Sequence, residues 1–207
     1  GAPTPTVYSD DTVKNGTLGF RASVNTLTLV SVKDRGATAA TTDDTNYLGV
    51  ALDTFAGDLV GLESVLAFHG YGVDAVLNSA KLNGVAATNL DWSTFSTASG
   101  LDITTELAAL NATGYGALVA GVDLAIKGDV ALDVLSGTLV AQTAFDIKLG
   151  KVKSADLPSG DTKDADVMTL TLLGANVFVG SGGSLLDNNG GAPTPTVYSD
   201  DTVKNGT

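Results

Sequence analysis

The first seventeen residues of the chain return unchanged as its last seventeen. Residues 1–17 and residues 191–207 both read GAPTPTVYSDDTVKNGT. A fixed repeat indicates an array of similar units, and identical ends also suit a strand that one subunit donates to the sheet of the next. Either the chain is one 190-residue repeat followed by the start of another, or its terminal strand is duplicated so that the subunit fills its own groove. Both alternatives predict a subunit that stands in a row with copies of itself.

The repeated segment itself contains a candidate strand, which an acidic turn follows. Neighbouring strand residues point to opposite faces, so Val7 and Tyr8 cannot both face a core. We expect Val7 to be the buried anchor, because the parity partners of Tyr8 offer no better apolar choice. The predicted assembly strand comprises Thr6, Val7, Tyr8 and Val13 in the first copy and Thr196, Val197, Tyr198 and Val203 in the second.

The acidic residues indicate which secondary structure dominates. Only Glu63 and Glu106 are glutamates, and the other 21 of the 23 carboxylates are aspartates. Glu favours helix interiors, whereas Asp favours turns and caps. The many Gly, Thr, Val and Ala residues are likewise typical of strands joined by turns. A hydrophobic content of 43% and a mean hydropathy of +0.22 are enough for a substantial core.

Apolar and β-branched runs recur at the spacing of an all-β domain. The stretch Asp58 to Phe68 is a near-continuous apolar run, which predicts a strand buried on both faces. Residues Ile103 to Leu110 are the one helix candidate, with Asp102 as its N-cap. The strands expected are 6–8, 18–24, 26–33, 47–55, 58–68, 73–77, 80–85, 117–127, 130–134, 138–148 and 167–179.

These elements predict an all-β fold, a jelly-roll or immunoglobulin-like β-sandwich of about ten strands with at most one short helix. Residues 1–17 would be a terminal strand or linker, residues 18–190 the sandwich, and residues 191–207 a donor strand or the start of the next repeat.

Charge and composition exclude several classes of partner. The net charge is −12, and eleven scattered basic residues do not form the cationic patch that nucleic acids or anionic membranes require. No run of 18 apolar residues occurs, so we expect no membrane insertion. The absence of cysteine excludes disulfides, zinc thiolates and thiol nucleophiles.

No pattern of catalytic residues is present. The single histidine, His69, ends the most apolar run, and no G-x-S-x-G elbow accompanies it. The glycine-rich stretch at residues 181–184 lacks the lysine of a phosphate loop. We therefore expect a protein that is not an enzyme.

Calcium is the one cofactor that the sequence suggests. The densest acidic cluster comprises Asp161, Asp164 and Asp166, and loop carboxylates are ligands that Ca²⁺ prefers. Lys163 lies inside this cluster, so solvated turn aspartates are the alternative. A sugar-stacking platform of Trp92, Phe95 and Tyr71 stands against ordinary core packing of the same rings.

Two stretches resemble cohesin-like domains of bacterial or archaeal surface proteins. The first is DLVGLESVLAFHGY, residues 58–71, followed by Val76-Leu77, and the second is GTLVAQTAFDIK, residues 137–148. Gly72-Val73 stands where that family often has Asp-Pro. The resemblance implies a jelly-roll β-sandwich that serves adhesion or assembly outside the cell, and it carries over no contact pattern for a partner.

Together these features predict an extracellular, cell-surface structural subunit. Copies of itself would be its partners, joined through the duplicated terminal strand into a fibre, a pilus or a tandem-repeat adhesin. The alternative is a cohesin-like module that binds a protein or a glycan.

Overall fold

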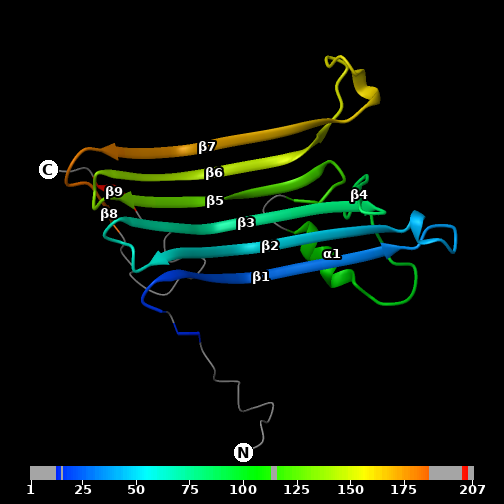
Figure 1. The fold of residues 1–207 in the computed structure, drawn as a ribbon, viewed down its shortest axis with the longest axis horizontal. Coiled ribbons are helices and arrows are strands. Elements are labelled where there is room, and N and C mark those ends of the chain that lie inside the picture. Colours follow the sequence, from blue (N-terminus) through cyan, green and yellow to red (C-terminus); the bar gives the residue numbers. More distant parts are fainter. Residues whose placement is uncertain (1–12, 15, 113–115, 187–201, 205–207) are drawn as a thin grey trace, which may run out of the picture.

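One large antiparallel sheet dominates the computed structural model, which describes residues 13–14, 16–112, 116–186 and 202–204. Its six long strands lie in the order β1-β2-β3-β5-β6-β7, and the short β4 pairs with the end of β3 (Figure 1). A separate two-stranded sheet joins β8 to β9. The strands are β1 (Gly19–Asp34), β2 (Thr45–Val60), β3 (Leu66–Leu82), β4 (Val85–Ala86), β5 (Val122–Val134), β6 (Leu139–Val152), β7 (Ala165–Val179), β8 (Ser184–Leu186) and β9 (Thr202–Lys204).

The predicted all-β class is confirmed. Besides the strands, the described residues contain one α-helix, α1 (Thr104–Asn111), and two single 3₁₀ turns, η1 (Thr41–Asp43) and η2 (Gly160–Thr162). The two layers of a sandwich are not shown, because the second sheet within the described part of the chain has only two short strands. No described helix has the length and apolar character needed to span a membrane.

The predicted helix is confirmed within one residue at each end. Asp102 lies one position before the N-cap, Ile103, and its Oδ1 accepts hydrogen bonds from the Thr104 backbone N–H and hydroxyl. The hydroxyl bond first, and the backbone bond second, hold the pKa of Asp102 below its ordinary 3.8. On its inner side, α1 buries Leu107 and Leu110.

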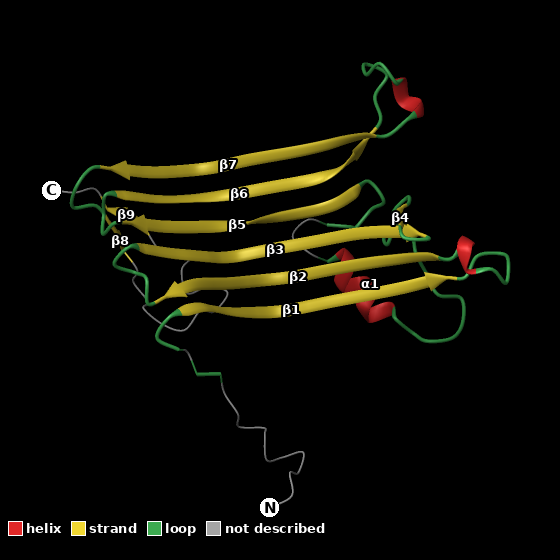
Figure 2. Ribbon diagram, in the orientation of Figure 1, coloured by secondary structure: helices red, strands yellow, loops and turns green. Residues whose placement is uncertain are grey.

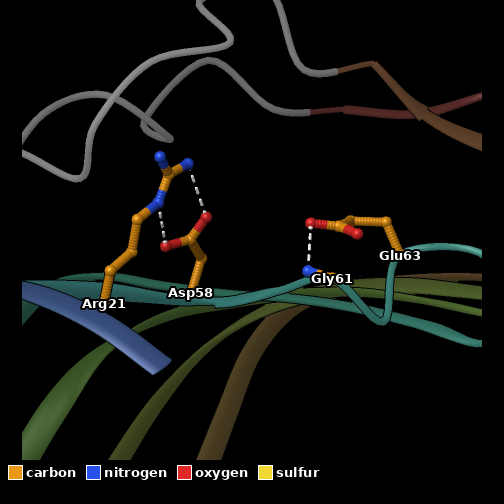
Figure 3. A network of polar contacts seen from close by, with 4 residues as sticks. All are labelled: Arg21, Asp58, Gly61 and Glu63. Carbon is orange, nitrogen blue, oxygen red and sulfur yellow. Dashed lines mark hydrogen bonds and ion pairs between the residues drawn. The ribbon is translucent and has the colours of Figure 1, made fainter. Parts of the chain in front are cut away.

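The expected strand over residues 58–68 is wrong, because the chain turns back in its middle. Gly61 has φ of +82°, a conformation that glycine adopts at low cost, and its N–H donates to Glu63 Oε1 at 2.9 Å (Figure 3). The backbone N–H of Leu66 then bonds the carbonyl of Leu62 at 2.7 Å. The apolar run therefore forms the end of β2, a tight turn and the start of β3.

Several expected short strands are pieces of longer ones, because the sheet carries a line of β-bulges. Strand registers shift near Thr54 in β2, near Gly72 in β3 and near Gly174 in β7, and all three residues have positive φ. Each bulge shifts the alternation of side chains by one residue. The strand continues through the bulge, but the break in the alternating pattern of the sequence resembles the end of a strand.

Two clusters of buried side chains lie on one face of the sheet, which we call the covered face. At one end, Trp92 and Leu110 pack over Val30, Ala51, Val76 and Ala125. At the other end, Leu185 of β8 packs against Ala56, Tyr71 and Ala131. The two clusters share a face because Ala125 and Ala131 are an even number of residues apart in β5, whose pairing with β6 is regular from Leu124 to Val134.

Candidate assembly site

The chain after β7 is held against the turn between β5 and β6, and this contact positions β8. The N–H of Gly183 donates to the Gly137 carbonyl at 3.2 Å, and the N–H of Gly180 donates to the Thr138 carbonyl at 3.0 Å. A Cβ on Gly137 would collide with the Gly183 carbonyl, and Gly137 also has φ of +91°. Glycine is therefore required where the two backbones cross. Asp133 Oδ1 fixes the turn by accepting the Gly137 N–H at 2.6 Å.

β8 is completed by the second copy of the repeated segment. Residues Ser184, Leu185 and Leu186 pair antiparallel with Lys204, Val203 and Thr202 respectively. The pair lies over the sheet at the end away from α1, with β8 next to β5 and β6, and β9 next to β6 and β7. Leu185 faces the buried Ala56, Tyr71 and Ala131, so the short pair forms the lid of this end of the core.

The two copies of the same sequence occupy different environments. Val203 lies in β9 and is half-buried, whereas its counterpart Val13 is 96% exposed and belongs to no strand. Since the sequences are identical, position alone accounts for the difference. Among the described residues of the first copy, Val13 and Lys14 belong to no strand, whereas their counterparts Val203 and Lys204 lie in β9.

The other predicted assembly residues, Thr6, Val7, Tyr8, Thr196, Val197 and Tyr198, lie outside the described residues. Val203 is the described residue of the predicted strand that pairs within a sheet. Sequence reasoning missed its partner β8. A Ser-Leu-Leu triplet directly after a glycine-rich turn is a signal for a short strand, although three residues are too few to show a period.

A partly buried ion pair lies on the covered face at the same end of the sheet. Arg21 of β1 and Asp58 of β2 face each other in register, with Nε–Oδ1 at 2.6 Å and Nη2–Oδ2 at 2.8 Å. The Asp58 side chain is 6% exposed and the Arg21 side chain 26%. Figure 3 shows the pair rising from the face over which β8 and β9 pass. His69 follows Asp58 in the same cross-strand row and is also buried.

Two further polar groups, Tyr71 and Asp129, lie on the part of the covered face beneath β8 and β9, which we call the floor. Tyr71 is buried, and its hydroxyl accepts a hydrogen bond from Gln142 Nε2 at 2.8 Å. Asp129 lies opposite Tyr71 in the ladder, and partial burial raises its pKa above the ordinary 3.8. The floor is therefore fixed by directional contacts, and it carries one carboxylate that burial disfavours in its charged form.

Two of the predicted calcium residues, Asp164 and Asp166, lie at or directly before the start of β7, where they face lysines. Asp166 Oδ1 accepts from Lys151 Nζ at 2.9 Å, and Asp164 lies 3.9 Å from Lys153 Nζ. The bond to Asp166 is the main reason why the pKa of Lys151 is raised. Asp161 lies apart in η2. Among the residues that the structure describes, no group of three or more His, Cys, Asp or Glu side chains could hold a metal ion.

The aromatic side chains considered for sugar binding belong to the core. Trp92 is fully buried, and its Nε1–H donates to Asn78 Oδ1 at 3.0 Å. Phe95 meets the Trp92 ring edge to face, with centroids 5.7 Å apart. Tyr71 is buried at the opposite end of the sheet. The three rings therefore form no common platform.

Comparison with known proteins gives no match to a family model, to a curated protein or to a solved structure. The resemblance to cohesin-like domains therefore rests on its two sequence stretches, and it stays a prediction.

Proposed function

We propose that the protein is an extracellular structural subunit that assembles with copies of itself by strand exchange at β8. In a row of subunits, residues 12–14 of one subunit would take the place that residues 202–204 occupy in this chain. The observation that carries the proposal is the contrast between Val203, paired over the core, and Val13, exposed in an identical sequence. Backbone hydrogen bonds of an added strand give affinity, and contacts of its alternate side chains give specificity.

The geometry suits strand exchange, because β9 is short and makes few contacts that a strand from another subunit would have to replace. β9 has three residues, and the only large apolar side chain it brings is Val203. Its partner β8 is already anchored at the crossing of Gly183 over Gly137. An incoming strand would thus meet a preformed acceptor, which lowers the entropic cost of binding.

Three variants of the full chain test the proposal. Val203→Asp places a carboxylate at the half-buried position where β9 pairs with β8, and it should release β9, because a charge that is partly withdrawn from water without a partner is unfavourable. The freed acceptor should then be filled by residues 12–14 of another molecule, so this variant should form open-ended chains in electron micrographs and in sedimentation. Val13→Asp should leave the parent state unchanged.

The double variant Val13→Asp/Val203→Asp is the decisive control, because it frees the acceptor and removes the donor. It should not grow chains, although its β8 is as exposed as in the single variant. Equal growth of the single and double variants would show nonspecific aggregation of an unpaired edge. A single variant that forms no chains would refute strand exchange.

A further inference from the structure

The face of the sheet opposite α1 and β8 is a continuous apolar surface, which we call the open face. In Figure 2 the strands run in front of α1 and of the β8–β9 pair, and no other described element crosses them. Cross-strand pairing arranges its side chains in six successive rows, and in three of these every strand contributes an apolar residue. The first complete row is Leu29, Val50, Leu77, Leu124, Leu149 and Met168. The second is Leu27, Leu52, Ala75, Ile126, Ile147 and Leu170.

The remaining four rows are also apolar, and they reach the far end of the sheet. Thr143 is the one polar residue in them, and its hydroxyl donates to the neighbouring Ala144 carbonyl. The rows are Val24, Phe55, Val73, Gly128, Phe145 and Leu172; then Ala22, Gly57, Gly70, Val130 and Thr143; then Phe20, Leu59, Phe68, Leu132, Ala141 and Val177; and finally Leu66, Val134, Leu139 and Val179. No charged side chain stands in any of the six rows.

The line of bulges keeps this face apolar along its whole length. In β3, Gly70 and Val73 are three residues apart and still point to the same side, because Gly72 takes a left-handed conformation between them. Without the bulge, every apolar residue beyond it would turn to the other face. Near the bulges, the rings of Phe20 and Phe55 stack with centroids 6.3 Å apart over Gly57, which lets them lie flat on the sheet.

On the edge strand β7, the side chains of the open face are exposed to solvent in the isolated subunit. Met168 is 71% exposed and Leu170 is 60% exposed, and none of the residues of the open face belongs to either buried cluster. Six strands about 4.8 Å apart and rows that span about 33 Å give an area of roughly 900 Å². Contiguous apolar patches on monomeric proteins rarely exceed a few hundred Å².

We infer that the open face is covered by the open face of a second copy of this chain. Two such faces would bury about 1,800 Å² in total, which is the size of a specific, stable interface. Sheets pack face to face about 10 Å apart, and this arrangement needs flat rows of aliphatic and aromatic side chains on both partners. The dimer would supply the second layer of a sandwich that the described part of one chain does not contain.

Charge also favours this occupant. Over the length of the six rows, the charged side chains of the strands, such as Arg21, Lys127 and Asp129, lie on the covered face and would point away from the partner. Beyond the row of Leu29, the next positions of the open face include Lys33 and Lys81, which give it a polar border. The net charge of −12 opposes an anionic membrane surface.

The test compares charges placed on the two faces of β7 in the full chain. Leu170→Glu/Leu172→Glu puts two carboxylates on the open face, and Thr169→Glu/Thr171→Glu puts two on the opposite face of the same strand. All four positions are exposed in the subunit, so both variants should fold. By sedimentation equilibrium at micromolar concentration, the parent and the threonine variant should have twice the 20.8 kDa subunit mass. The leucine variant should have the subunit mass.

Cross-linking gives a second readout that does not depend on these substitutions. The chain has no cysteine, so Ala75→Cys places a single thiol near the centre of the open face. A short bismaleimide should join two such chains, and it should not join chains that carry Thr169→Cys on the covered face.

Two results would overturn the inference: a monomeric parent, or a leucine variant that dimerises like the parent. A monomeric parent that binds phosphatidylcholine vesicles would make a lipid surface the occupant. Failure here is distinct from failure of strand exchange, because face pairing ends at a dimer and does not involve Val13 or Val203.

Discussion

The ion pair between Arg21 and Asp58 should respond unequally to removal of its two partners. Asp58 is the more deeply buried of the two, with its side chain 6% exposed against 26% for Arg21. Arg21→Ala therefore leaves a buried carboxylate without its bidentate partner. Asp58→Ala leaves a long guanidinium side chain that can turn toward water.

The size of the effect follows from this difference in exposure. Removing one partner of a fully buried pair costs about 3–5 kcal/mol. Since Arg21 is partly exposed, we expect about 2–4 kcal/mol for Arg21→Ala and about 1–2 kcal/mol for Asp58→Ala. Replacing both, as in Arg21→Met/Asp58→Leu, should change the free energy of unfolding by less than about 1 kcal/mol, because no charge is then left unpaired.

Urea unfolding of the parent and the three variants gives these free energies, and thermal melting gives a second estimate. For a chain of this length each kcal/mol shifts the melting temperature by about 2–4 °C, so Arg21→Ala should lower it by roughly 4–16 °C. Two results would refute the reasoning: equal losses for the two single variants, or a double variant that is less stable than either of them.

Three other predictions concern Asp129 beneath β8, the contact between Gly137 and Gly183, and the acidic loop before β7. Asp129 has a raised pKa in the folded state, so it contributes stability that is complete below the ordinary 3.8 and is lost as pH rises through the folded value. Asp129→Asn should therefore raise the unfolding free energy at neutral pH and make no difference in acid, as measured by urea unfolding at both pH values. Gly137→Ala should displace the Gly183 backbone and increase hydrogen exchange at Leu185 while leaving the far end of the sheet protected. If the loop binds calcium, millimolar Ca²⁺ should raise the melting temperature of the parent and not of Asp164→Asn/Asp166→Asn; an equal response would remove calcium from this loop.

The all-β class and the single helix could be predicted from the sequence because both depend on local preferences. Aspartate in place of glutamate disfavours helices through most of the chain, and the helix at α1 has the spacing of Leu107 and Leu110 that a packed helical face requires. Neither inference needs to know which strand pairs with which.

The positions of the turns could not be predicted as well, because two of the signals mislead. The turn between β2 and β3 contains Leu62 and Val65, so an apolar run continues through it. Conversely, the bulge at Gly72 interrupts a period without ending a strand. Both cases are decided by long-range pairing, which a local period does not contain.

The candidate site was predictable in part. The exact repeat predicts that the repeated segment takes part in assembly, and Val203 belongs to the predicted strand. The acceptor β8 is too short to have a pattern. The open face was hidden because alternation predicts one apolar side for every strand, and it does not say whether the layer that covers this side belongs to the same chain.

A disulfide between the donor and the acceptor tests strand exchange most directly. Leu185 and Val203 are register partners, so Val13, the counterpart of Val203, should face Leu185 of the neighbouring subunit. Directly opposed strand residues lie at the Cα separation that a disulfide bridges. Leu185→Cys/Val203→Cys should therefore close a bond within one chain and serves as the control. In Val13→Cys/Leu185→Cys/Val203→Asp, oxidation should produce a ladder of covalent oligomers on a non-reducing gel, and a product that stays at the mass of one chain would contradict assembly through the repeated segment.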